Sequence, residues 1–328
     1  MTSEPTLCLR PVRRDDLDGL QRLAAGASPG IGSLRNDAAW LAQRIEHSLQ
    51  AFATDDDEVS GEERYLFVLH DEATDRLVGC SGITARAGYG SRFYSYRNEF
   101  VVASSAGLGI TQRTHTLHLC HDLTGTTLLT SFYIEPEWAE GAAPQLLSRG
   151  RLLFIRQFSQ RFSDRIVAEH PGWLDAQRNS PFWDAVGRRF FAMDYPQAEA
   201  LAGGRSKAFI AELMPTSPVY VPLLPEAAQR AIGQLHPEGE LPFAILQDEG
   251  FDAETYIDLF DGGPITEGRL HALGSVRAAR ARTPRAEPVP VIACHGRREG
   301  FEARVLWGTA PATWGEGGLI TPLERDEA

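Results

Sequence analysis

Two strand-like runs joined by a short polar turn constrain the fold of this chain more than any other feature. "RYLFVLH" and "RLVGCSGITAR" are rich in apolar, β-branched and aromatic residues, and only "DEATD" separates them. This pattern predicts an antiparallel hairpin from Tyr65 to Ala85. Further strand-like runs, "YSYRNEFVVA", "GTTLLTSFYI", "RIVAEH" and "KAFIAEL", indicate that the hairpin belongs to a larger sheet.

Amphipathic segments lie between these runs. "AAWLAQRIEHSLQAF" and "PQLLSRGRLLFIRQFSQRF" have helical periodicity, and "SPFWDAVGRRFF" is predicted to be one helix with Ser180 as its N-cap and Pro181 in its first position. Hairpins mixed with helices favour an α+β (mixed α/β) fold, in which helices flank a mixed sheet, over a doubly wound parallel sheet. A hydrophobic content of 43% over 328 residues is enough for a substantial core.

The amino-acid composition of the chain changes near residue 276. An Arg/Pro/Ala-rich stretch is followed there by short strand-like runs between Gly-rich turns. We therefore predict a main domain over 1–275 and a small β-rich subdomain over 276–328.

Composition excludes several classes of function. The net charge is -12 and the basic residues are dispersed, which argues against nucleic acid as a ligand. No apolar run is long enough to cross a bilayer, so no membrane role is expected and the cytoplasm is the predicted location. The four cysteines form no CxxC pair and are predicted to be reduced and buried.

A histidine-rich stretch is the first candidate site. "HTLHLCHD" carries possible zinc ligands at His115, His118, Cys120, His121 and Asp122. On a strand these side chains divide between two faces, so local polar packing is favoured and no metal site is predicted. A zinc-stabilised binding module is the alternative.

Two acidic residues and one histidine remain as candidates. In "YIDLFDGGP", Asp258 lies in an apolar run and Asp261 opens a turn, so the pair either binds a guanidinium or closes the turn. His236 is followed by Pro237 between two helical patterns, and it is either a proton carrier or a solvated turn residue. A strand, the turn "EPEWAEGAAP" and a helix also form a possible site for a nucleotide-like group at the helix N-terminus.

Several stretches together resemble a known family. "SPFW", "VGRRFF", "KAFIAELMP", "GQLHP", "EGF" and "YIDLFDGGP" are similar to bacterial arginine N-succinyltransferases. Within that family, "LCHDLTGTTLLTSFY", "SRGRLLF" and "YVPLLPEAAQ" most resemble the alpha subunit of arginine/ornithine succinyltransferase. The resemblance runs from "LRPV" to the β-rich tail. It implies an acyl-CoA N-acyltransferase fold with a small β-barrel-like C-terminal subdomain.

The resemblance also implies a reaction and its residues. Succinyl-CoA is the expected co-substrate, without a permanently bound cofactor, and L-arginine or L-ornithine is the expected acceptor. By the "GQLHP" match the family's proton-transfer residue falls on His236. By the strand before the "EPEW" turn, the family's succinyl-CoA contact falls on Phe132. We expect Arg149, Arg151 or helix amides to contact the CoA phosphates. The expected ligands of the guanidinium are Asp258, Asp261 and Glu169.

One stretch departs from the family's pattern. Single-subunit members carry a basic turn of the kind "RKEGNG" before the cofactor helix, whereas this chain reads "AEGAAP" from Ala139 to Pro144. Alpha-type members share this change and resemble proteins that work beside a beta subunit. We therefore expect a homologous beta subunit or a homo-oligomer. The alternative function is a weakly active or noncatalytic alpha subunit that needs its partner for CoA binding.

Overall fold

The structure is a computed structural model of the 328-residue chain. It describes residues 7–27, 33–90, 92–202, 213–214, 216–281, 287, 289–308 and 318–323. The predicted strand "KAFIAEL" lies outside these residues except for its last position.

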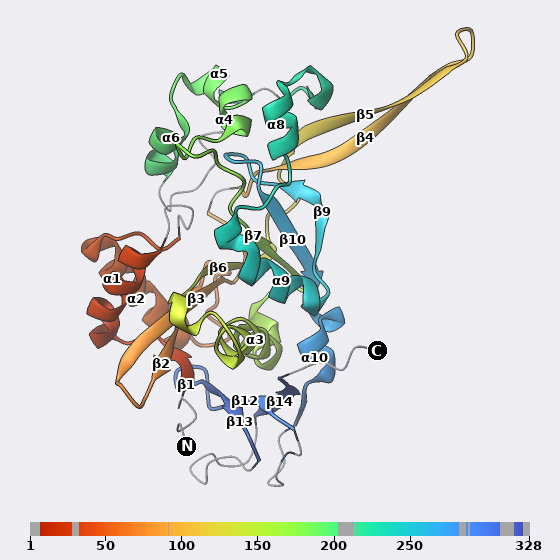
Figure 1. The fold of residues 1–328 in the computed structure, drawn as a ribbon. Helices are drawn as coiled ribbons and strands as arrows, with labels where there is room; N and C mark the ends of the chain where they lie inside the picture. Colours follow the sequence, from red (N-terminus) through yellow and green to blue (C-terminus); the bar gives the residue numbers. More distant parts are fainter. Residues whose placement is uncertain are drawn as a thin grey trace.

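One large sheet organises the molecule (Figure 1). Its 14 strands have the order β11-β14-β12-β13-β1-β2-β3-β6-β7-β10-β9-β4-β5-β8. Among these pairs β6 and β7 are parallel and the others are antiparallel, so the predicted mixed sheet is confirmed. The strands are β1 (Leu7–Pro11), β2 (Arg64–Asp71), β3 (Arg76–Thr84), β4 (Ser95–Ser105), β5 (Ile110–Cys120), β6 (Thr127–Ile134), β7 (Arg165–Glu169), β8 (Val219–Tyr220), β9 (Asp252–Ile257), β10 (Pro264–Arg269), β11 (Arg280–Ala281), β12 (Val291–His295), β13 (Glu302–Leu306) and β14 (Leu319–Pro322).

Helices pack on both faces of this sheet. The predicted 65–85 hairpin is confirmed: it consists of β2 and β3. Side chains of α1 and α2 cover one face of this hairpin. On the opposite face α3 is buried almost all round, against β1, β2 and β12. The helices are α1 (Leu17–Gly26), α2 (Ala38–Ala53), α3 (Ala142–Gln157), α4 (Pro181–Ala185), α5 (Arg188–Phe191), α6 (Tyr195–Ala202), α8 (Glu226–Ala231), α9 (Glu240–Glu249) and α10 (Gly274–Ala278).

The segment predicted as one helix over 180–191 is instead two short helices. Ser180 caps α4 as expected, because its Oγ accepts a hydrogen bond from the Trp183 amide at 3.0 Å. The helix stops at Val186, and α5 begins after Gly187. A Cβ on Gly187 would lie 2.2 Å from the Trp183 ring, so the close packing of this break requires glycine.

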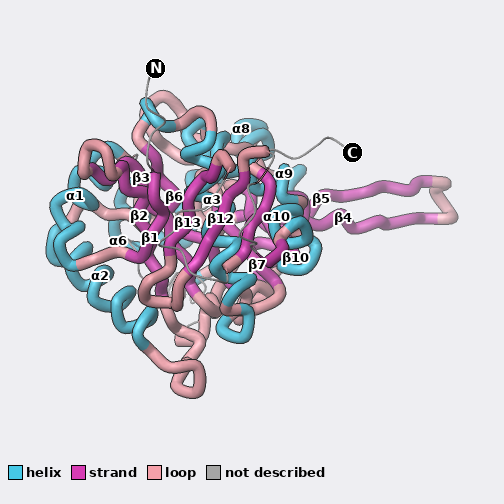
Figure 2. The backbone as a smooth tube through the Cα atoms, turned by 90° about the horizontal axis from the view of Figure 1, so that it is seen from below, coloured by secondary structure: helices cyan, strands magenta, loops and turns pink. Residues whose placement is uncertain are grey.

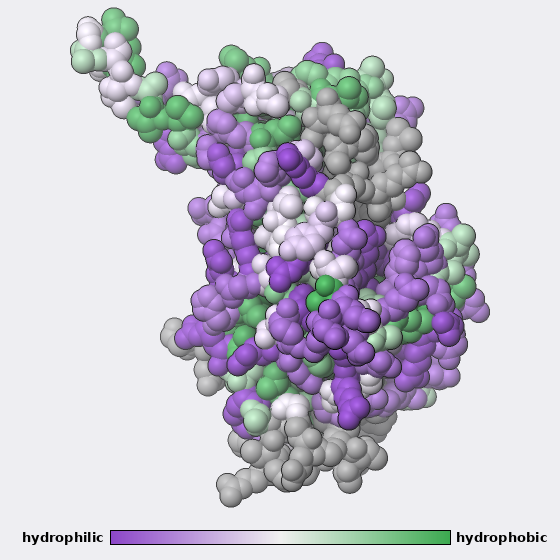
Figure 3. Space-filling view, turned by 180° about the vertical axis from the view of Figure 1, so that it is seen from behind, coloured by the Kyte–Doolittle hydropathy of each residue, from purple (hydrophilic) through white to green (hydrophobic). Residues whose placement is uncertain are grey.

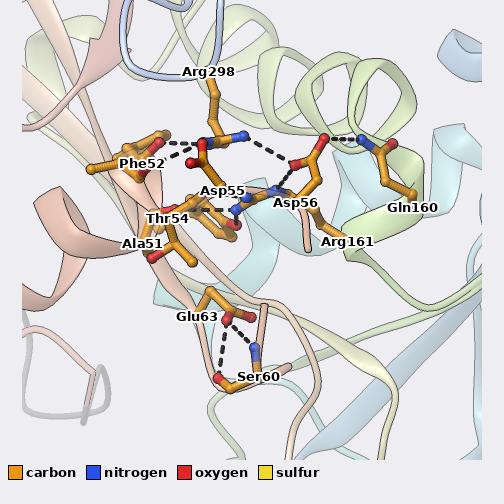
Figure 4. A network of polar contacts seen from close by, with 12 residues as sticks. Ala51, Phe52, Thr54, Asp55, Asp56, Ser60, Glu63, Gln160, Arg161 and Arg298 are labelled. Atoms are coloured by element: carbon orange, nitrogen blue, oxygen red, sulfur yellow. Dashed lines mark hydrogen bonds and ion pairs between the residues drawn. The ribbon is translucent and has the colours of Figure 1, made fainter. Parts of the chain in front are cut away.

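The C-terminal strands continue the sheet. β13 pairs with β1 at Ala303 and Leu9, and β12 and β14 follow outward, so the sheet is open in the described part of the chain. A polar network joins this region to the body (Figure 4): Arg298 donates to the Phe52 carbonyl at 2.5 Å and to Asp56 at 3.1 Å. Asp56 also pairs with the buried Arg161 at 2.7 Å. A domain boundary at residue 276 stays a prediction.

A two-stranded ribbon projects far from the body (Figures 1 and 2). β4 and β5 pair along their whole lengths, from Ser95 with Cys120 to Ser105 with Ile110. The ribbon's outer half is exposed, including several large apolar side chains: Phe100, Val101, Val102, Leu108 and Ile110. We call the exposed part, residues 100–115, the arm. None of the helices within the described ranges is long and apolar enough to cross a membrane.

Candidate active site

The centre of the site is a β-bulge on β6. Its pairing with β3 shifts register between Cys80 and Gly82, opposite Ser131, whose φ is 54°. A non-glycine residue in this left-handed region is strained and persists where its surroundings hold it. Here the Ser131 amide donates to Ser33 Oγ at 3.0 Å, and Ser131 Oγ donates to the Ser33 carbonyl at 3.1 Å. The bulge therefore re-aims the backbone at Phe132.

The pairing of β6 with its neighbour β7 ends before the bulge. β6 and β7 pair in parallel from Thr127 with Ile166 to Leu129 with Ala168. β6 then continues to Ile134 and β7 to Glu169, without further pairing between them in the described residues. The edge of β6 near Phe132 thus carries backbone groups that β7 does not use.

His236 is held at the far end of β7. Its backbone amide donates to the Pro171 carbonyl at 2.9 Å, and Leu235 forms a β-bridge with Gly172. The ring caps the short turn Pro237–Gly239, because Nδ1 accepts a hydrogen bond from the Glu238 amide at 3.3 Å. A neutral ring with Nδ1 as acceptor carries its proton on Nε2. The side chain is 23% exposed, so this Nε2–H group can meet a substrate.

Asp261 braces the segment that carries His236. Its Oδ2 accepts from the Gly172 amide and its Oδ1 from the Gly263 amide, both at 2.8 Å. Asp258 is equally buried and accepts from the Phe260 amide at 2.7 Å. Both carboxylates therefore close turns, and both put negative charge beside the His236 support.

Glu199 joins these two acids and was missed in the sequence, where it lies in a weakly patterned helix. Burial raises its pKa to about 7, and the charges of Asp261 and Asp258 add to this effect. Arg178 and a hydrogen bond from Tyr195 act in the opposite direction. Three acidic side chains thus influence one another here, and carboxylates are the usual partners of a guanidinium.

His170 was also missed. It follows β7 directly, is 4% exposed, and its Nε2 lies 3.0 Å from Thr266 Oγ1. Burial, assisted by the charge of Arg151, lowers its pKa to about 3. The ring is therefore neutral at physiological pH and supports the end of β7. A histidine immediately after an apolar strand was the only signal in the sequence.

The two arginines expected at the CoA phosphates lie in the interior. Arg149 is 4% exposed, pairs with Glu249 at 2.9 Å and donates to the Leu323 carbonyl. Arg151 is 2% exposed, and its Nη1 donates to the carbonyls of Gly82 at 3.3 Å and Thr130 at 3.4 Å. Neither guanidinium is placed to meet a phosphate at the surface, which corrects that expectation. Both are structural cations.

Phe132 lies on β6, and Glu169 lies on the neighbouring strand β7. Phe132 is half-buried on β6, with the Arg151 guanidinium carbon 5.6 Å from its ring centre. Glu169 ends β7 opposite Ile265 and is also half-buried. Phe132 thus lies at the bulge, whereas Glu169 lies on the strand that leads to His236.

The N-terminus of α3 follows β6 after a short turn. Gly141 is its N-cap with a φ of 70°, and no side chain caps the helix. The amides of Ala142 and Ala143 belong to the first turn, whereas Pro144 has no amide hydrogen. These free amides form an anion-binding end without a basic side chain in the turn.

The histidine-rich stretch lies on β5 and just beyond it. His115 contacts Asn98, and His118 lies 3.1 Å from Thr116 Oγ1, so the two rings have separate partners. Among the described residues no three His, Cys, Asp or Glu side chains are grouped as metal ligands.

Comparison with known proteins identifies the class. The family model described as "Arginine N-succinyltransferase beta subunit" matches residues 7–275. The structure superposes on arginine/ornithine succinyltransferase subunit AI from Pseudomonas aeruginosa with a TM-score of 0.85, at 40% identity, covering 98% of this chain and 100% of that one. The fold and the family are thus those of an acyltransferase.

Sequence relatives agree with the structural match. Arginine N-succinyltransferase subunit alpha of P. aeruginosa is 46% identical over 308 residues, covering 92% of this chain and 90% of the relative. Arginine N-succinyltransferase of Salmonella schwarzengrund is 38% identical over 283 residues, covering 86% and 82%. The chain belongs to the arginine N-succinyltransferase family, and the predicted family is confirmed.

Proposed function

We propose that this chain transfers the succinyl group of succinyl-CoA to the α-amino group of L-arginine, with L-ornithine as the alternative acceptor. One observation carries the site assignment: the bulge at Phe132 lies on β6, the segment of His236 is joined to the residues that follow β7, and the pairing of β6 with β7 ends before both. An acyl thioester and an amine can then approach each other between the two groups.

The reaction needs no covalent enzyme intermediate. The neutral α-amine attacks the thioester carbonyl, a C–N bond forms, and the carbonyl oxygen becomes an oxyanion that backbone amides near Phe132 stabilise. When the C–S bond breaks, the sulfur takes a proton and the nitrogen loses one. His236 Nε2 gives the proton it already carries to the sulfur and takes the proton that the nitrogen loses, so the ring is neutral again at the end.

We propose that the acidic group of Asp258, Asp261 and Glu199 attracts the cationic end of the acceptor, with Glu169 nearer the reacting end. A guanidinium forms strong, often bidentate hydrogen bonds with carboxylates.

Binding of L-arginine should strengthen as pH rises from 6 to 8. Glu199, with its pKa raised to about 7, is mostly protonated at the lower pH and mostly charged at the higher one, whereas the guanidinium stays charged throughout. We expect the Kd for arginine to fall by about tenfold over this range. Calorimetric titration checks this.

The matched control for that titration is Glu199→Gln, which cannot ionise. It should bind arginine weakly, with a Kd that does not change between pH 6 and 8. An unchanged pH dependence in this variant would remove Glu199 from the acceptor site.

The CoA phosphates, in our proposal, lie at the free amides of α3 rather than on arginine side chains. Because the turn "AEGAAP" supplies no cation, we propose that a homologous subunit or a second copy completes this contact.

The exposed arm supports the proposal that a second subunit is present. Figure 3 shows green apolar residues on it, whereas much of the body is purple. Residues 100–121 contain Arg113 and no Asp or Glu, although the whole chain carries -12. An apolar, weakly basic ribbon suits the body of a second copy of this acidic chain.

The function is tested by measuring CoA release from succinyl-CoA, with L-arginine or L-ornithine, for the chain alone and mixed with a beta-type chain. We expect release that depends on the amino acid and rises when the partner is present. Mass spectrometry should find N2-succinylarginine. Sedimentation velocity of the same samples reports the assembly.

Two results would count against these proposals. Absence of succinylated product in both preparations contradicts the transferase activity. A monomer that is fully active alone contradicts the need for a partner, and it leaves the transferase activity in place.

A further inference from the structure

Two arginines, the half-buried Arg44 and the buried Arg151, flank the bulge of β6 from helices on opposite faces of the sheet. Arg44 of α2 donates from Nη2 to Ser131 Oγ at 2.7 Å, and Arg151 of α3 donates to the Thr130 carbonyl at 3.4 Å. The Nε atoms of both side chains are buried and have no hydrogen-bond partner in the described part of the chain. Each guanidinium thus keeps an unused donor next to the bulge.

No carboxylate in the described ranges pairs with either cation. The other strongly buried arginines do have such partners: Arg10 with Asp16, Arg149 with Glu249, and Arg161 with Asp56. Burial lowers the pKa of Arg44 to about 10 and that of Arg151 to about 9. A cation held away from bulk water without a carboxylate among the described residues is costly unless an anion joins it. The position of these two arginines therefore points to a ligand that brings its own negative charge.

The sheet is shaped to accept the Arg44 guanidinium. A Cβ on Gly82 would lie 2.7 Å from Thr130 Oγ1 and 3.1 Å from Arg44 Nη2, so a larger residue would displace this group. Trp40 covers the guanidinium, whose carbon lies 5.3 Å from the ring centre. The orientation of Arg44 is thus fixed by the strand and by its own helix.

We propose that Arg44 binds the distal carboxylate of the succinyl group, and that Arg151 is a positioning residue that holds the bulge and adds positive charge. The inference rests on the proposed function. The thioester carbonyl is assigned to the backbone near Phe132, and the carboxylate lies two methylenes beyond it. Arg44 contacts the neighbouring residues Thr130 and Ser131, where that carboxylate would arrive. The pair would select a dicarboxylic acyl group over an apolar one.

The test compares succinyl-CoA with butyryl-CoA, whose four-carbon chain ends in a methyl group. We expect Arg44→Met to lower kcat/KM for succinyl-CoA by about 100-fold, the loss of a buried charge-assisted contact. Its kcat/KM for butyryl-CoA should change less than about threefold by the same reasoning. Arg14→Met is the control, because Arg14 is an exposed arginine that pairs with Glu46 at the surface of α2.

Two further outcomes decide the proposal. An equal loss with both thioesters would show that Arg44 only supports the fold, and would overturn the subsite while leaving the transferase activity standing. A wild-type enzyme that transfers no succinyl group would instead overturn the proposed function. If Arg44→Met does not fold, Arg44→Lys replaces it: we expect Arg44→Lys to favour succinyl-CoA less strongly than wild type, and an unchanged preference would contradict the assignment.

Discussion

His236→Ala should lower kcat by about 100-fold or more, the usual contribution of a general acid or base. The imidazole accepts from the Glu238 amide through Nδ1, which leaves the Nε2 proton available to the departing thiolate. The backbone contact of His236 with Pro171 does not involve the side chain, so the variant should keep its fold. Steady-state assays and urea unfolding measure the two properties.

His271→Ala is the matched control for this prediction. His271 is 74% exposed and pairs with Asp164 at 3.0 Å on the surface. It should retain wild-type turnover. Equal turnover in His236→Ala, wild type and His271→Ala would make His236 a turn residue only.

Gly263→Ala should destabilise the protein by about 3 kcal/mol, at the upper end for overpacking. A Cβ at this position would lie 2.3 Å from the His170 carbonyl and 2.6 Å from the Gly172 amide, and neither backbone atom can rotate away. The turn that Asp261 holds would move apart from the segment bridged to Leu235. Activity should therefore fall together with the urea midpoint.

Gly300→Ala provides the comparison, since a Cβ there meets no atom within 4 Å and its φ requires no glycine. Its stability should change by less than about 0.5 kcal/mol. Should Gly263→Ala be as stable as Gly300→Ala, the close packing of the two glycine-bearing segments would be disproved.

The sequence predicted the parts of the fold that local pattern determines. The hairpin of β2 and β3 and the helices α2 and α3 follow from local sequence patterns. Helix α2 buries a regular face, whereas β2, β3 and α3 are buried on nearly all sides. The break between α4 and α5 did not follow from such patterns, because it depends on the contact of Gly187 with Trp183. The pairing of β13 with β1 joins segments at opposite ends of the chain, which local patterns do not reveal.

The residues of the candidate site were harder to predict from local sequence patterns. His236 and Phe132 came from the family resemblance, whereas spacing alone left His236 as either a proton carrier or a turn residue. Arg149 and Arg151 were misassigned because α3 is buried almost all round, so its arginines point inward. Arg44, Glu199 and His170 gain their significance from burial and from neighbours distant in the sequence, which no local pattern encodes.

The central claim is that His236 reaches the amine and the thioester sulfur beside the bulged strand. A crystal structure with CoA and L-arginine bound tests it most directly. We predict that His236 Nε2 lies within hydrogen-bond distance of the arginine α-amino group or the CoA sulfur, with the pantetheine arm along β6 at Phe132. An arginine and a CoA thiol bound elsewhere, with the ring facing solvent, would contradict it.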